Sequence, residues 1–228
     1  MSSDHDTIRR ILTFIRERRY ESGDRLPSER DFAERFNVSR GVVRKAISAL
    51  VAVRVIEVRS TSGNYLKELS AEASFEAIVL ENVVGLPLSP DEVSASIETR
   101  VVLEREAVRL ACERVDEAGL AKIQAALDAT ERRLAEGKPI NLEDTEFHLA
   151  LAGASGNSVL VRLLNAFYVL SQERRHIYFE TADHGRQSHA EHLEIFAAVS
   201  KRDAETAARL IARHVTRAYE YFSPKYDP

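Results

Sequence analysis

The sequence of 228 residues has only one cysteine, Cys112, and no tryptophan. A lone cysteine excludes a disulfide within the chain and a zinc finger built on several thiolates. No apolar run approaches the ~20 residues that a helix needs to cross a bilayer. The opening residues, MSSDHDTIRR, lead into no apolar stretch of the secretory kind. We therefore expect a protein of the reducing cytoplasm without a membrane partner.

Charge is abundant and unevenly distributed. The hydrophobic content of 44% and the charged content of 30% are typical of a globular protein. Residues 1–67 carry 14 basic and 9 acidic side chains, whereas residues 68–228 carry 18 and 27. The second part also holds six of the seven histidines. This division predicts a small basic domain suited to a polyanion and a larger acidic domain with a different role.

The basic part has the pattern of a winged helix-turn-helix over residues 1–68. Apolar residues at helical spacing and the capping residues Ser28 and Ser39 predict three helices, with Asp31 completing a capping box at the second. Two extended pieces around the turn residues 60–63 predict a β-hairpin. The predicted elements are helices over 7–20, from Ser28 and from Ser39, and strands over 55–59 and 64–67.

The second part is predicted to be a wholly helical bundle over residues 74–228, after a linker at 69–73. The motif Ser89-Pro90-Asp91-Glu92 is a strong helix start, because it supplies an N-cap, a proline in the first turn and a glutamate at the third position. The fold class is therefore mainly α. The predicted helices span about 89–115, 116–136, 141–156, 157–181, 185–200 and 203–222.

The third helix of the basic part carries candidate DNA-reading residues. Arg40 and Arg44 are four residues apart and share one face, where arginine can pair bidentately with guanine. Ser39 at the helix start favours a phosphate, Arg30 could contact the backbone or a base, and Gly63 permits close approach of the hairpin tip. The alternative is an ordinary solvated basic face.

Three motifs favour the DNA-binding interpretation: G-D-R-L-P-S-E-R from Gly23, N-V-S-R from Asn37 and S-G-N-Y-L from Ser62. Together they resemble the DNA-binding domain of GntR-type bacterial transcriptional regulators. The hairpin tip, Ser60-Thr61-Ser62, departs from this pattern, because it lacks the basic residues that many members carry there. The resemblance implies DNA contacts from Arg25, Arg30, Ser39, Arg40, Arg44 and Gly63.

In the acidic part, one carboxylate and three histidines could meet at a metal ion. Asp144 and His148 are four residues apart on one predicted helix, and His192 and His214 lie on the apolar stripes of two others. Helix bundles commonly build metal sites in this way. Zinc is expected first, and nickel, manganese or iron would also suit these ligands. The alternatives are a helix-start carboxylate and hydrogen-bonded core histidines.

This part resembles the all-helical FCD effector domain of the FadR subfamily. The matching motifs are E-x-R-x-x-x-E from Glu98, D-x-x-x-H from Asp144 and H-x-x-I from His192, with His214 on the final helix. The resemblance implies a divalent metal ion held by Asp144, His148, His192 and His214.

Arg100 is expected to face the interior, where an unpaired guanidinium would be costly. Its partner could be Glu104, one helical turn away, or the carboxylate of a small ligand. The resemblance implies that such a ligand is an organic or sugar acid, which would bridge Arg100 and the metal.

We therefore predict a homodimeric regulator, most simply a repressor, that binds a palindromic operator and responds to a small carboxylate. A winged helix alone reads too few bases for a genome, and two-fold pairing doubles the readout. Two other functions compete with this one. A metal-dependent helical enzyme lacks an evident base or nucleophile motif here, and a nonspecific DNA-coating protein would need no buried His/Asp cluster.

Overall fold

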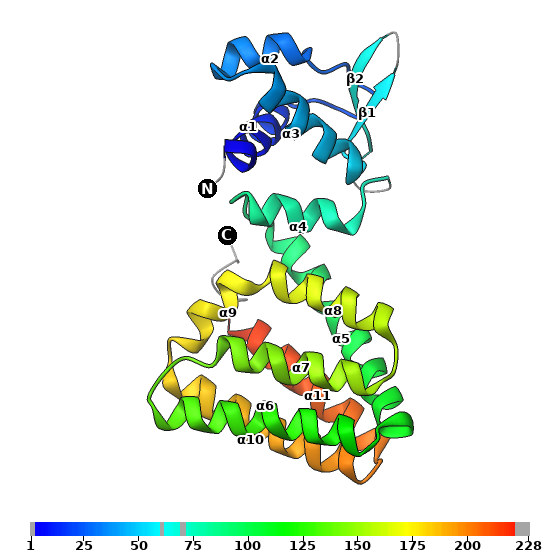
Figure 1. The fold of residues 1–228 in the computed structure, drawn as a ribbon, viewed down its shortest axis with the longest axis vertical. Coiled ribbons are helices and arrows are strands. Elements are labelled where there is room, and N and C mark those ends of the chain that lie inside the picture. The colour runs from blue at the N-terminus through cyan, green and yellow to red at the C-terminus, as the bar shows by residue number, and fades with distance from the viewer. Residues whose placement is uncertain (1–2, 60–61, 69–71, 222–228) are drawn as a thin grey trace. The chain divides into compact units, whose positions relative to one another are not determined.

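The computed structural model describes residues 3–59, 62–68 and 72–221 and is mainly α-helical. The chain divides into two compact units, residues 1–88 and residues 89–228, which are described separately below. The first unit contains the predicted three helices and β-hairpin, and the second is a helical bundle (Figure 1).

The first unit begins with three helices whose starts follow the capping chemistry of the sequence. Ser28 and Asp31 form the predicted capping box, and the Ser39 side chain accepts a hydrogen bond from the Val42 amide. Asn37, in the left-handed conformation, ends the second helix and makes the tight turn. The elements are α1 (Ser3–Glu17), α2 (Glu29–Phe36), α3 (Arg40–Ala52), β1 (Ile56–Arg59), β2 (Gly63–Leu66) and α4 (Phe75–Val83).

Strands β1 and β2 pair antiparallel, with Ile56 opposite Leu66 and Arg59 opposite Gly63. Ile56 and Leu66 are buried and join the core made by α1, α2 and α3. The hairpin is therefore anchored at its base. The tip residues Ser60 and Thr61, in the predicted wing, lie outside the described residues.

Helix α4 is an addition to the predicted outline. Ala77 and Val84 pack into the core of the first unit, and Glu81 accepts a hydrogen bond from Arg16 at 2.6 Å. Because of this packing, the boundary between the compact units falls after Leu88 rather than at the predicted linker, residues 69–73. Residues 69–71 of that linker lie outside the described part of the chain.

The second unit is built of helices only within its described residues. Ser89 and Glu92 form the predicted capping box, and Pro90 occupies the first turn. The helices are α5 (Pro90–Arg114), α6 (Glu117–Ala135), α7 (Asn141–Ala154), α8 (Ser158–Leu170), α9 (Gln172–Phe179), α10 (Ala182–Ser200) and α11 (Ala204–Glu220).

The prediction of a single helix over 157–181 is wrong. The helix is interrupted at Ser171, between α8 and α9. The Ser171 hydroxyl donates to the Phe167 carbonyl at 2.9 Å, beside the backbone bond from the Ser171 amide at 3.0 Å, and serine side chains that bond back in this way often bend helices. Helix α9 is therefore separate from α8. Its residue Arg175 lies in the interior of the unit and is 8% exposed.

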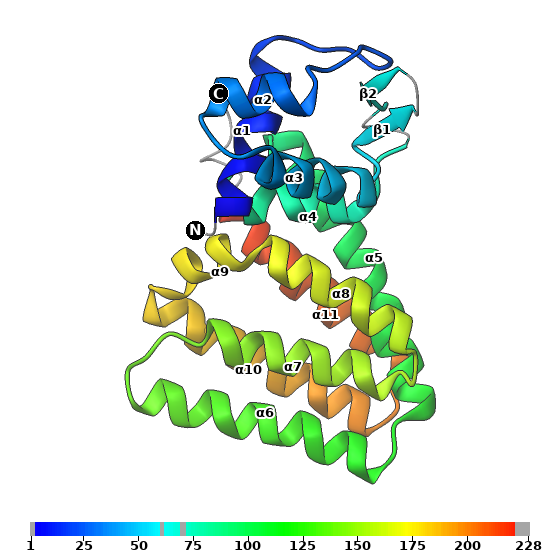
Figure 2. The same cartoon turned by 45° about the horizontal axis from the view of Figure 1, so that its top comes forward.

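The helices of the second unit pack around a main apolar core and smaller apolar clusters beside it. Helix α11 packs along α5, and α6, the lowest helix in Figure 2, packs against both α7 and α10. Phe147, Ile195 and Ile211 are fully buried at the centre of this packing. None of the described helices combines the length and apolar content required to cross a bilayer.

Candidate functional site

The first unit presents its predicted DNA-reading residues at the start of α3. Arg40 and Arg44 are both exposed, and Arg44 donates from Nε and Nη2 to Glu29 at 3.1 Å. Ser39, the N-cap, accepts from the Val42 amide through its side chain, which fixes the start of the helix. The helix start therefore presents two exposed arginines on one surface.

The other predicted contacts lie on α2 and at the hairpin. The side chain of Arg30 is 71% exposed and approaches Glu34 at 3.7 Å. Gly63 has a φ of +111°, and a Cβ there would lie 3.3 Å from Nε of Arg25. Arg25 is exposed and also pairs in a β-bridge with Tyr65. The structure thus brings Arg25 and Gly63 together beside the wing.

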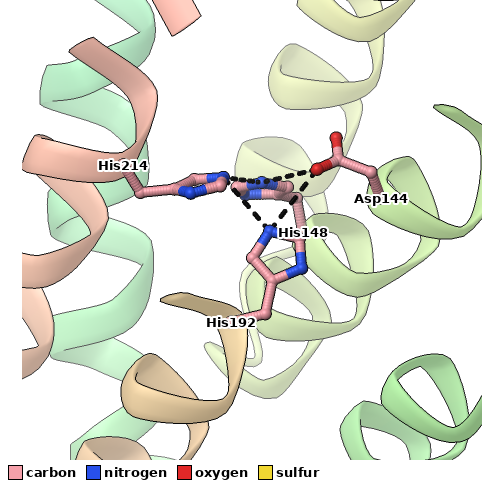
Figure 3. A group of neighbouring side chains, drawn as sticks. All are labelled: Asp144, His148, His192 and His214. Atoms are coloured by element: carbon pink, nitrogen blue, oxygen red, sulfur yellow. Dashed lines mark hydrogen bonds and ion pairs between the residues drawn. The ribbon is translucent and has the colours of Figure 1, made fainter. Parts of the chain in front are cut away.

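In the second unit, the structure brings together the side chains of Asp144, His148, His192 and His214 (Figure 3). Asp144 and His148 come from α7, His192 from α10 and His214 from α11. All four are buried, and one ligand atom from each lies within 4.8 Å of the others. The four residues, here called the His/Asp cluster, could therefore hold one ion.

Two glutamates orient the imidazoles of this cluster. Nδ1 of His148 lies 2.6 Å from Oε2 of Glu104, and Nδ1 of His214 lies 2.7 Å from Oε2 of Glu191. Burial tends to raise the pKa of Glu104, but His148 and Arg100 outweigh it and hold the pKa far below its usual value. An ionised carboxylate only accepts hydrogen bonds. Nδ1 of His148 is therefore a donor, and Nε2 is left to face the cluster.

Protonation inside the cluster is disfavoured. Burial, followed by repulsion from His214 and His148, lowers the pKa of His192 well below its ordinary value. Burial also lowers the pKa of His214, although Glu191 opposes the shift. Neutral imidazole is the metal-binding form of histidine. Because Nδ1 of His148 and Nδ1 of His214 each donate to a glutamate, the Nε2 lone pairs of these two rings point at each other.

Three of the distances between ligand atoms suit a common ion. Nε2 of His214 lies 3.2 Å from Nε2 of His148 and 3.1 Å from Nε2 of His192, while His192 Nε2 lies 3.4 Å from Oδ1 of Asp144. Atoms each about 2.1 Å from one zinc-like ion stand roughly 3.0–3.4 Å apart at 90–109°. Two unprotonated nitrogens at this spacing cannot hydrogen-bond, so a cation between them fits the donor set.

The second oxygen of Asp144 is held by Arg175. Nη2 of Arg175 donates to Oδ2 at 2.7 Å, and Nη1 donates to Thr145 at 2.6 Å. Burial would raise the pKa of Asp144, but Arg175 and the histidines outweigh it and lower the pKa. Asp144 is thus kept ionised with Oδ1 directed at the cluster.

Arg100 pairs with Glu104, which is one of the two partners predicted for it. Nε donates to Oε1 of Glu104 at 2.6 Å, and Nη2 donates to the Tyr168 hydroxyl at 2.6 Å. Among the described residues, Nη1 has no hydrogen-bond partner. A small cavity of about 30 Å³, lined by Arg100, Arg175, Asp144 and His214 among others, lies beside the cluster. We call it the cluster cavity.

Sequence reasoning did not identify the supporting side chains Arg175 and Glu191, nor the bond from Glu104 to His148. Arg217 was also missed, although it fixes Glu191 through Nη2 at 2.9 Å. Their only sequence signal is a charged residue at a buried helical position, which appears only once the packing is known. The remaining histidines of the second unit, His176, His184 and His189, lie outside the cluster.

Comparison with known proteins follows the same division of the chain. Residues 5–66 match the gntR family of bacterial regulatory proteins, and residues 95–217 match the FCD domain. The chain belongs to the GntR family. Its combination of the two domains is that of the FadR subfamily.

The similarity of this GntR-family protein to known regulators extends over most of both chains. The regulator LutR of Bacillus subtilis is 32% identical over 210 residues, covering 90% of this chain and 94% of LutR. The Uxu operon transcriptional regulator of Escherichia coli is 30% identical over 86% of this chain and 77% of its own. The solved structure of Lar from Listeria monocytogenes shares the fold, with a TM-score of 0.65 at 19% identity over 96% and 98% of the two chains.

The protein is therefore a DNA-binding transcriptional regulator of the GntR/FCD type, not an enzyme. Regulators of this family bind DNA and commonly act as dimers. DNA binding accounts for the basic first unit, here called the DNA-binding head.

Proposed function

We propose that this regulator is a homodimeric repressor whose operator affinity is controlled by a small carboxylate bound beside a metal ion. The observation that carries the proposal is the His/Asp cluster, in which three Nε2 atoms and Oδ1 of Asp144 face one point. Asp144, His148, His192 and His214 would hold the ion. When bound, a divalent ion supplies a Lewis-acidic centre to which an organic acid can attach.

Arg100 and Arg175 would recognise the acid from the other side. Both line the cluster cavity next to Asp144 and His214. Nη1 of Arg100 is available, and charge-assisted hydrogen bonds to carboxylates are the strong ones. The names of two relatives fit an acid effector: a galactonate operon repressor and a putative L-lactate dehydrogenase operon regulator, both of Escherichia coli and each 28% identical.

In the head, we propose that Arg40 and Arg44 read base edges while Ser39 and Arg25 contact phosphates. Arg30 and Gly63 would complete the contacts at α2 and at the wing. A palindromic operator is expected, because two heads related by two-fold symmetry read two half-sites. Acid binding would shift the helices around the cluster and change operator affinity, a coupling that is typically 5–150-fold.

The experiment selects duplexes from a random pool with the metal-loaded protein and then titrates organic and sugar acids into the binding assay. We expect a palindromic consensus and at least one acid that weakens operator binding at least fivefold. If every acid that binds the protein leaves operator affinity unchanged, the coupling is wrong. If random duplex binds as tightly as the selected sequence, specific operator recognition is wrong.

A further inference from the structure

A second cavity adjoins the cluster cavity inside the helical unit. It has a volume of about 50 Å³ and lies against α5, α8, α9 and α11. Both cavities are lined by Arg100, Arg175, Val215 and Ala218, so they meet along these side chains. We call the second one the α5–α8 cavity.

The lining of the α5–α8 cavity is largely apolar. Val93, Phe167 and Leu170 are 1%, 5% and 2% exposed, and Ile97 lines the cavity beside them. A space enclosed by such groups rewards an apolar occupant, since each buried methylene removes apolar surface from water.

The hydroxyl groups of the two serines that line this cavity already donate hydrogen bonds to backbone carbonyls. Ser96 donates to the Val93 carbonyl at 2.7 Å, and Ser171 donates to the Phe167 carbonyl at 2.9 Å. Hydroxyl groups of a ligand placed beside these serines would lose water and receive no hydrogen bond from them in return, which costs free energy. The cavity therefore disfavours a polyhydroxylated chain.

Three arginines line the α5–α8 cavity, and two of them, Arg100 and Arg175, also line the cluster cavity, whereas Arg174 does not. Cζ of Arg100 and Cζ of Arg175 lie 4.5 Å and 4.9 Å from the centroid of the Tyr168 ring, so two guanidinium groups gather where the cavities meet. A carboxylate is therefore drawn to the end that faces the His/Asp cluster, and the rest of the ligand extends among Ile97, Phe167 and Leu170.

We propose that the regulatory ligand is a carboxylic acid with a short unbranched apolar tail rather than a sugar acid. This inference rests on the proposed function, because it assigns the chemical class of the acid bound at the same site. A water-sized guest needs roughly 10–15 Å³ of such space. The α5–α8 cavity therefore suits a tail of about three to five carbons.

The test uses the full-length, metal-loaded protein and isothermal titration with straight-chain 2-hydroxy acids from three to eight carbons. Galactonate serves as the polyhydroxylated comparison. We expect the affinity to rise about fourfold per added methylene, as apolar burial predicts. The gain should stop once the tail exceeds the cavity, and galactonate should bind more weakly than the five- and six-carbon acids.

Two variants test whether the apolar tail of the ligand occupies the α5–α8 cavity. Ser96→Leu should fill the cavity and remove the gain with chain length while lactate still binds. Ser94→Leu is the matched control, because Ser94 lies on the same helix but is exposed. Ile97→Ala should enlarge the cavity and move the optimum to longer tails, which keeps the test valid if Ser96→Leu does not fold.

The outcomes separate this inference from the proposed function. Galactonate binding as tightly as the six-carbon acid, or a gain per methylene that both Ser96→Leu and Ile97→Ala leave unchanged, would overturn the apolar-tail inference alone. Failure of every acid, sugar acids included, to bind the metal-loaded protein would overturn the proposed function and the inference with it.

Discussion

Glu104 joins His148 to Arg100 through its two carboxylate oxygens. Oε2 lies 2.6 Å from Nδ1 of His148, and Oε1 accepts from Nε of Arg100 at 2.6 Å. One buried side chain thus orients an imidazole of the His/Asp cluster and neutralises the guanidinium that lines both cavities. Substituting Glu104 should therefore affect both the proposed metal binding and the proposed acid binding of the helical unit.

Glu104→Gln should lower metal affinity about 10–100-fold, the usual effect of losing the carboxylate that orients a metal-binding histidine. Competition with a chromophoric chelator measures this loss. Glu98→Gln is the control, because Glu98 lies on the same helix and is exposed. Unchanged metal affinity in Glu104→Gln would contradict the role of Glu104 in orienting His148.

His192→Ala should abolish the response of the helical unit to chelation. A ligand present at 100 times its Kd stabilises the folded state by about 2.7 kcal/mol, so stripping the wild type with EDTA should lower its Tm. The variant should melt at one temperature with or without EDTA, while the DNA-binding head stays folded. His176→Ala, whose imidazole is 60% exposed, should keep the wild-type response. A full metal equivalent in His192→Ala would show that the ligand assignment is wrong.

Arg44→Ala should weaken operator binding by about 1–3 kcal/mol and relax the choice of base at one position in each half-site. Its side chain is 64% exposed and held by Glu29, so little folding energy is at stake. Binding to the selected operator and to single-base variants measures both effects. Lys122→Ala, which removes one charge from the helical unit, should change neither. Unaltered base preference in Arg44→Ala would assign this arginine to the solvated surface.

Gly63→Ala should destabilise the head by about 1 kcal/mol or more, because alanine is strained at a φ of +111°. The added methyl also meets Arg25 at 3.3 Å, so operator affinity should fall. Chemical denaturation and the DNA-binding assay report the two effects. At Gly153 in α7 nothing lies within 4 Å of the new methyl, and Gly153→Ala should stabilise its helix by about 1 kcal/mol. Equal stability of Gly63→Ala and the wild type would contradict the predicted strain.

Leu163→Glu should disrupt the proposed homodimer. Val159 and Leu163 are 61% and 40% exposed one turn apart on α8, next to α5, where Val102 is 62% exposed. A buried charge in a two-fold interface would be repeated on both copies. Light scattering after gel filtration should show a monomer with weaker binding to the palindrome. Leu193→Glu, at an exposed leucine on α10, should remain dimeric. A dimeric Leu163→Glu protein would exclude this face from the interface.

The sequence was a good guide wherever local chemistry decides the outcome. Ser28, Ser39 and Ser89 cap helices as predicted, because a serine side chain can satisfy amides of the first turn without any tertiary contact. Helix α4 and the break at Ser171 escaped prediction. Helix α4 depends on apolar contacts with the core of the first unit, and the break depends on the hydrogen bond that the Ser171 hydroxyl makes. Helical periodicity in the sequence does not reveal these contacts.

The same distinction applies to the candidate site. The spacing of Asp144 and His148 and the apolar register of His192 and His214 predicted four inward side chains, and the structure brings all four together. The residues that hold them in place come from elsewhere in the chain. Glu191 reaches His214 from another helix, and Arg175 reaches Asp144 from α9, which begins after Ser171.

The divided carboxylate of Asp144 has a thermodynamic consequence. Oδ1 faces the histidines, whereas Oδ2 is bonded to Arg175, which lines both cavities. In the proposed regulator, an ion pulls on one oxygen and an acid competes for the arginine on the other. Linkage then demands reciprocity: whatever factor the acid applies to metal affinity, the metal applies to acid affinity. Cellular metal supply would thereby set the concentration of acid at which the gene responds.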